Sequence, residues 1–162
     1  IEIHHNWIGG LLEHTLQILA YCQVSWQLFP ELDKDLLILG AISHDVGKMD
    51  ELVVTSRIKG SLRGQLLGHT ILGVMSLKDR IDNSSLSEEA KVKLLHLIVS
   101  HLGKMEFGAS KEPMFPEAVV LHYADNISSK TAEMLEFVSK SRGETEDDFM
   151  FHRRDRKNIF LK

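Results

Sequence analysis

The stretch ISHDVGKMDEL, residues 42–52, places imidazole and charged side chains directly after one of the most apolar segments of the chain. Residues 36–42 are apolar on nearly every side, which predicts a central buried helix that ends near Gly47. An unpaired charge at such a position would be costly, so His44 and Asp45 need partners. A divalent cation satisfies imidazoles and carboxylates together, and mixed nitrogen and oxygen ligands suit manganese, iron, zinc, nickel or cobalt better than calcium.

Other segments predict helices around this central one. Residues 10–28 carry apolar side chains with helical period, and His14 shares the inward face of that helix with Leu11 and Ile18. The remaining predicted helices cover about residues 66–81, 87–101 and 116–138. No strand pattern competes. The sequence therefore predicts an all-α fold, a single bundle of five or more helices with the site in its core.

Local signals refine the ends of these helices. Asp33 is expected to cap the central helix, and the spacing of Ser85 and Glu88 is typical of a capping box that opens the helix near residue 87. Residues 49–64 contain two glycines and no clear period, so we expect a loop or a short irregular excursion there.

Composition limits the class of protein. The chain has 162 residues, 43% of them hydrophobic and 26% charged, which fits one globular domain. The net charge of −4 argues against nucleic-acid binding over the whole surface but leaves room for a local basic groove. The single Cys22 is expected to be a buried, inert thiol, and no apolar run is long enough to span a membrane, so we expect a cytoplasmic protein.

Charge divides the chain into two parts. We expect a helical domain over residues 1–140 and a charged C-terminal tail over residues 141–162. Within that tail, acidic residues at 144–148 precede basic residues at 153–157, which is typical of a solvated, mobile segment. A packed or RNA-contacting tail is the alternative.

Several further side chains fall where they could join His44 and Asp45. His14, His69, His101 and Asp125 all lie on predicted helices or at their ends. Asp125 lies within an apolar helix, where its charge needs compensation. His4 and His5 precede the first helix, so they could lie in an exposed terminus or line the mouth of a cleft. His96 and His152 are expected in the core or on the surface, away from the site.

Two side chains near these candidates have supporting roles. Lys48 follows His44 by four residues and Asp45 by three, so it lies on their face, where an ammonium group could hold a phosphate oxygen. By itself it would be a solvated lysine at a helix end. His122 precedes Asp125 by three residues and could orient that carboxylate.

The order His14, His44-Asp45, Asp125 on helices resembles the HD-domain superfamily of metal-dependent phosphohydrolases. The segments HHNWIGGLLEHTLQIL, LGAISHDVGKMDEL, GQLLGHTILG and LLHLIVSHLGKMEFGASKEPMFPEAVVLHYADNISSK, with the closing RRDRKNIFLK, resemble the YhaM-type 3′→5′ exoribonucleases along nearly the whole chain. Leu102 stands where many relatives have a second histidine, and Ser128-Ser129 replaces an Asp-Ala pair.

The resemblance implies a set of roles. One divalent metal would be bound by His14, His44, Asp45 and Asp125, and a second would be drawn by His69 and His101. Manganese is the expected ion, with iron, nickel, cobalt, zinc or magnesium as alternatives. Asp45, shared by both metals, and Lys48, the phosphate-binding lysine, would be the catalytic residues. The family usually carries an OB-type domain ahead of the helical one, so we expect that this chain is part of a longer protein.

Three functions are compatible with such a site. The first is a phosphodiesterase that releases nucleoside 5′-monophosphates from the 3′ end of single-stranded RNA, by attack of a metal-activated water. Arg57, Lys59 and Arg63, with the basic tail, are candidate strand contacts, although plain solubility also explains them. The second is a phosphohydrolase that acts on nucleotides or signalling nucleotides. The third is a non-catalytic domain that binds a nucleotide and regulates a neighbour.

Overall fold

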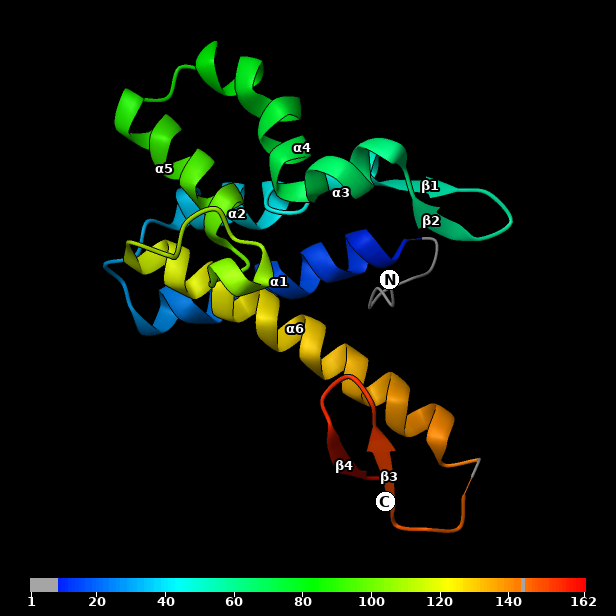
Figure 1. The fold of residues 1–162 in the computed structure, drawn as a ribbon. Helices are drawn as coiled ribbons and strands as arrows, with labels where there is room; N and C mark the ends of the chain where they lie inside the picture. Colours follow the sequence, from blue (N-terminus) through cyan, green and yellow to red (C-terminus); the bar gives the residue numbers. More distant parts are fainter. Residues whose placement is uncertain (1–8, 144) are drawn as a thin grey trace.

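The computed structural model describes residues 9–143 and 145–162. Five long helices dominate it, as Figure 1 shows, and the predicted all-α class is confirmed. The helices are α1 (Gly10–Leu28), α2 (Lys34–Ser43), α3 (Lys48–Glu51), α4 (Leu62–Asp82), α5 (Glu88–Ser100) and α6 (Pro116–Ser141), with a 3₁₀ turn at Met105–Phe107. The strands are β1 (Leu52–Val54), β2 (Ile58–Gly60), β3 (Phe149–His152) and β4 (Lys157–Phe160).

Side-chain caps fix where these helices begin. Asp33 accepts a hydrogen bond from the amide of Leu36 at 3.0 Å, so the predicted cap of α2 is confirmed. The capping box predicted at Ser85 is wrong, because Ser87 is the N-cap of α5 and accepts from the amide of Ala90. Ser87 takes this role because residues 84–86 belong to the preceding turn. In that turn, the hydroxyl of Ser84 donates a hydrogen bond to the carbonyl of Ile81 in α4.

The core lies between α1, α2, α5 and α6. Ile18, Leu37, Leu97 and Leu121, one from each of these helices, are fully buried. Gly40 lets α2 and α5 approach closely, since a Cβ there would lie 2.6 Å from the Leu97 side chain. This packing brings the ends of α2 and α5 together and so positions the side chains that follow them.

The segment before α4 contains regular structure that the sequence did not predict. Residues 49–64 form the end of α3, the antiparallel hairpin β1–β2 and the start of α4, rather than a loop. α4 begins at Leu62, earlier than predicted, because Ser61 caps it. Gly68 interrupts this helix with φ 73°, a left-handed value that favours glycine.

The C-terminal segment, for which a solvated tail was expected and a packed tail was the alternative, forms a β-hairpin. β3 and β4 pair antiparallel, with Phe149 opposite Phe160, and the hairpin lies beside the C-terminal half of α6 (Figure 1). Ile159 and Leu161 are buried, and the His152 ring packs edge-on against Phe137 of α6. Burial of these side chains and the ring contact with α6 thus hold a segment whose composition is dominated by charge.

Within the described residues, none of the helices combines the length and apolar character needed to cross a bilayer.

Candidate metal centre

Six predicted ligands converge from five helices. His14 comes from α1, His69 from α4 and Asp125 from α6. His44 is the C-cap of α2 and Asp45 follows it, while His101 is the C-cap of α5. Because the chain turns at these helix ends, neighbouring side chains can face one point. His14, His44, Asp45 and His101 are almost completely buried, so the cluster lies in the interior.

Asp45 lies at the centre of this cluster and divides it into two groups. Its Oδ2 is 3.6 Å from His14 Nε2 and 3.5 Å from His44 Nε2. Its Oδ1 is 3.4 Å from His69 Nε2 and 3.6 Å from His101 Nε2. We call His14, His44 and Asp45 the His14 group, and Asp45, His69 and His101 the His69 group. Each has three potential ligand atoms within reach of one ion.

Asp125 extends the His14 group, because its Oδ1 lies 3.2 Å from His14 Nε2. Four nitrogen atoms and two carboxylates therefore face a common centre. Imidazole ligands suit transition metals such as zinc, iron or nickel, whereas magnesium and calcium prefer oxygen. The donor set fits divalent transition metals.

The outer nitrogen of each imidazole has an acceptor, which fixes its tautomer. His44 Nδ1 donates to the carbonyl of Ala41 at 2.9 Å, and His101 Nδ1 donates to the carbonyl of Ile98 at 2.8 Å. His69 Nδ1 lies 3.4 Å from Glu51 Oε2. Because Nδ1 carries the proton in each case, Nε2 presents a lone pair to the centre.

His14 reaches the same state through a side-chain relay. Ser128 Oγ donates to Gln17 Oε1 at 2.6 Å, so its oxygen accepts from His14 Nδ1 at 2.9 Å. Ser128 stands where the resemblance predicts an aspartate, and its hydroxyl supplies the acceptor that His14 needs to present Nε2 inward.

This arrangement needs a cation at its centre. His14 and His44 bring their Nε2 atoms to 3.4 Å, and His69 and His101 bring theirs to 3.3 Å. Two lone pairs facing at that distance repel. Asp45 Oδ1 is also buried, with no hydrogen-bond donor directed at it from the described residues. Divalent ions would remove the repulsion and satisfy the buried carboxylate together.

The electrostatics of the site keep its groups in the states that ligands require. Burial lowers the pKa of His101 to about 4, so its imidazole is neutral at pH 7. Burial by itself raises the pKa of Asp45, but His44, Lys48 and the other imidazoles outweigh it and hold the pKa well below its usual value. Burial by itself also raises the pKa of Asp125, but the close contact with the His14 ring and the neighbouring imidazoles outweigh it and leave the pKa lowered.

Lys48 lies inside the site rather than in solvent. Its Nζ is 2.6 Å from Asp45 Oδ2, and its side chain is only 15% exposed. Burial lowers its pKa, but the attraction of Asp45 is strong enough to leave the pKa raised, so the ammonium stays charged. This contact excludes the alternative that Lys48 is a solvated lysine at a helix end.

A pocket of about 440 Å³ opens onto the cluster. Asp45, Lys48, His69, His101 and Asp125 line it. Leu52 and Gly60, at the base of the β1–β2 hairpin, form one wall, and Ser129 of α6 lies on the pocket as well. The cluster is therefore buried in the protein yet accessible to a small substrate.

Two charged side chains that line this pocket were not singled out individually from the sequence. Glu51 faces His69, and only the fold of residues 48–60 brings it there. Arg154 comes from the C-terminal hairpin. The basic run at 153–157 indicated that the tail could meet a strand, but it carried no signal for which residue would face the site.

The residues predicted to contact an RNA strand lie outside this pocket. Arg57, Lys59 and Arg63 are exposed on or just after the β1–β2 hairpin and are not among the residues that line the pocket. His122 donates from Nδ1 to the carbonyl of His101 at 2.8 Å. It therefore supports the end of α5, in place of the expected contact with Asp125.

The other histidines take structural positions. His96 accepts from the amide of Met114, and His152 lies 3.3 Å from Asp155 in the C-terminal hairpin. Both lie away from the cluster, as expected. His4 and His5 lie outside the described residues.

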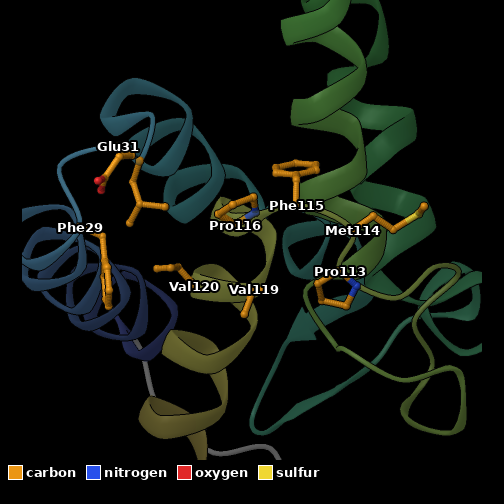
Figure 2. A pocket seen from close by; sticks show the side chains of 9 residues that line it. Phe29, Glu31, Pro113, Met114, Phe115, Pro116, Val119 and Val120 are labelled. Atoms are coloured by element: carbon orange, nitrogen blue, oxygen red, sulfur yellow. The ribbon is translucent and has the colours of Figure 1, made fainter.

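A larger cavity, of about 630 Å³, lies between the connection from α1 to α2 and the start of α6 (Figure 2). Figure 2 shows Phe29, Met114, Phe115 and Val119 around it, and its walls are mostly apolar. Glu31 is its one ionisable lining residue, so this cavity has none of the ligand chemistry of the cluster.

A buried set of histidines and aspartates from packed helices, below an open pocket, is typical of a metal-dependent hydrolase. Comparison with known families agrees, because the model of the HD domain matches residues 11–130. The chain belongs to the HD domain family, and the predicted resemblance is confirmed.

Curated relatives extend this result. The "3'-5' exoribonuclease YhaM" of Bacillus subtilis (strain 168) is 39% identical over 127 residues, which are 78% of this chain and 40% of the relative. The protein of the same name from Bacillus velezensis is 39% identical over 131 residues, 81% of this chain and 42% of the relative. That from Geobacillus sp. (strain WCH70) is 39% identical over 127 residues, 78% of this chain and 39% of the relative.

This chain thus spans about two fifths of the length of the curated relatives it matches. No solved structure matches it significantly.

Proposed function

We propose that this domain is a phosphodiesterase that shortens single-stranded RNA from the 3′ end and releases nucleoside 5′-monophosphates. The observation that carries the proposal is the division of the site by one buried carboxylate, Asp45, with two imidazoles on each oxygen. The name of the curated relatives supports the choice of substrate and direction.

The two groups would hold two divalent ions, and manganese is our choice among the transition metals. His14, His44 and Asp125 would bind one ion, His69 and His101 the other, and Asp45 would bridge them. Such ions, when bound, lower the pKa of a water molecule and offset the charge that develops on a phosphate.

Lys48 and Asp45 would act as the catalytic residues. Lys48 lines the pocket and is held beside Asp45 Oδ2, so its ammonium can contact a non-bridging oxygen of a phosphate that enters. Asp45 would fix the positions of Lys48 and the imidazoles relative to one another. Because the outer nitrogens are already hydrogen-bonded, the side chains need little rearrangement to receive a substrate.

The test compares Asp45→Asn with Asp50→Asn, a matched control because Asp50 is exposed on α3. Each protein is loaded with manganese, its metal content is measured by elemental analysis, and RNA labelled at either end is incubated with it. We expect the wild type and the control to bind metal and to trim RNA from the 3′ end, and Asp45→Asn to lose both properties.

The two competing functions give different results in the same assay. Intact RNA with hydrolysis of mononucleotides or cyclic dinucleotides would refute the exonuclease and favour a nucleotide phosphohydrolase. Bound metal with no hydrolysis of any phosphoester would instead indicate a regulatory domain. An OB-type domain in a longer protein, which the resemblance implies, would add affinity for the strand, so the assay uses RNA at high concentration.

A further inference from the structure

The C-terminal hairpin contributes a cation to the catalytic pocket. Arg154 lies in the turn between β3 and β4 and lines the same pocket as Asp45 and Lys48. The family match ends at residue 130, so the hairpin lies outside the matched part of the domain. A side chain at the site is therefore supplied by a segment that the family match does not include.

This turn is fixed on α6 by polar and apolar contacts. Arg154 Nη1 donates to Glu133 Oε1 at 2.9 Å, and Glu133 is only 17% exposed. The His152 ring packs on Phe137, with ring centroids 4.6 Å apart. Arginine has five N–H donors, so contact with one carboxylate oxygen leaves donors for a second anion. The guanidinium is thus positioned by the protein before a substrate arrives.

Lys48 and Arg154 lie at different depths in the pocket. The Lys48 side chain is 15% exposed and contacts Asp45 at the floor, whereas the Arg154 side chain is 52% exposed and lies at the rim. They are the Lys and Arg residues that line the pocket. Two cations at different depths suit a substrate with at least two phosphates along one chain.

We infer that Arg154 binds a second phosphate of the substrate, next along the strand to the phosphate that Lys48 contacts. This inference rests on the proposed function and deepens it, because it gives the site a preference for oligonucleotides over mononucleotides. A bidentate guanidinium contact also fixes where the strand leaves the pocket, between the turn of β3–β4 and the base of β1–β2.

The test measures binding by the manganese-loaded protein. The probe is a 5′-fluorescent RNA of about ten nucleotides, a length within the range single-strand sites contact, with phosphorothioate linkages that resist hydrolysis. Fluorescence anisotropy gives its dissociation constant over a series of salt concentrations. Arg154→Gln is compared with Arg153→Gln, the matched control, since Arg153 is exposed in the same turn and does not line the pocket.

We expect Arg154→Gln to weaken RNA binding about three- to fivefold and Arg153→Gln to stay within about twofold, since an exposed ion pair has a modest effect. The slope of log affinity against log salt should fall by about 0.7 in Arg154→Gln, the value for one phosphate contact on a single strand. Arg154→Lys should restore the slope but only part of the affinity. Binding of a fluorescent nucleoside 5′-monophosphate should not change.

The inference is overturned if Arg154→Gln matches Arg153→Gln, if mononucleotide binding falls equally, or if the wild type does not bind the RNA. Its failure is distinct from failure of the proposed function. A wild type that binds RNA through Arg154 but does not shorten the unmodified RNA would refute the exonuclease and leave the Arg154 contact standing.

Discussion

Replacement of Gly47 by alanine should disable one half of the metal centre and spare the other. Gly47 lies in the turn between Asp45 and Lys48, against the backbone of α4. A Cβ there would lie 1.9 Å from the carbonyl oxygen of His69 and 2.5 Å from the amide nitrogen of Gly73. The first distance is about 1.5 Å shorter than an ordinary contact. Because both obstacles are backbone atoms, the turn and α4 must move apart.

The movement separates Asp45 from His69 directly. Their present distance, 3.4 Å between Asp45 Oδ1 and His69 Nε2, leaves little tolerance, since a displacement of about 1 Å can cost about 100-fold in activity. His14, His44 and Asp125 come from α1, the end of α2 and α6 rather than from α4, so these three should keep their positions and still hold an ion. We expect Gly47→Ala to bind about half the metal of the wild type and to lose most hydrolysis of RNA.

Stability should fall as well. Overpacking of a tight contact destabilises by about 1–3 kcal/mol, which for a chain of this length lowers the melting temperature by about 2–12 °C. Thermal unfolding and elemental analysis measure the two effects. Gly73→Ala is the matched control from the other side of the same contact, because its Cβ would meet Ile98 Cγ2 at 3.4 Å. The control should be at least as stable as the wild type, since alanine favours a helix interior. A Gly47→Ala protein with wild-type melting temperature and metal content would refute the reasoning.

Three further changes test the surroundings of the site. In the metal-free protein, the pKa of His101 is about 4, against about 6.5 in the unfolded chain, so the unfolded state binds more protons between these pH values. The free energy of unfolding should therefore fall by about 3 kcal/mol as the pH drops from 6.5 to 4. Urea unfolding in the presence of a chelator measures this, and the same dependence of stability on pH in His101→Gln would contradict it. Ser128→Ala removes the hydroxyl that receives His14 Nδ1, so metal affinity should weaken about 10- to 100-fold in a metal titration, and an unchanged affinity would show that the relay is dispensable. Leu97→Ala opens a cavity in the core and should lower the free energy of unfolding by about 2–5 kcal/mol with no change in metal content, whereas a loss below about 1 kcal/mol would place Leu97 outside the core.

The long helices could be predicted because they carry strong local signals. Residues 10–28 combine a helical period with Pro30 beyond their end, and the structure begins and ends α1 at the predicted residues. The same helical period predicted that His14 faces inward. The end of α2 was predicted less closely, near Gly47, whereas the helix ends at Ser43. The need of His44 and Asp45 for partners could still be predicted, because an apolar run stops at them and buried polar groups are costly.

The hairpins could not be predicted in the same way. β1 and β2 have three residues each, too few to show a period of two, and none of these residues is buried, so no apolar face marks them in the sequence. β3 and β4 lie among charges that typify a solvated tail, and the burial of Ile159 and Leu161 depends on how the hairpin packs in the folded chain. Arg154 at the pocket follows from that packing and from nothing local in the sequence.

The sharing of Asp45 between two groups is also a tertiary property. Spacing along the chain placed Asp45 beside His44, but the distances from its two oxygens to His14 and His69 depend on how α1 and α4 approach the end of α2. The close contact of Gly47 with α4 sets the second of these approaches. A glycine that reads as a helix end in the sequence therefore controls the separation of two ligand groups.

The same helix ends supply both the ligands and their support. His44 and His101 are each the C-cap of an apolar helix, and each donates from Nδ1 to the carbonyl three residues before it, Ala41 or Ile98. Carbonyls in the last turn of a helix lack the amide partner found in its interior, so they are available as acceptors. The imidazole satisfies that carbonyl and is oriented by it, which directs Nε2 away from its own helix and toward Asp45. Two helices that end in this way, side by side, create a preformed ligand set before any metal binds.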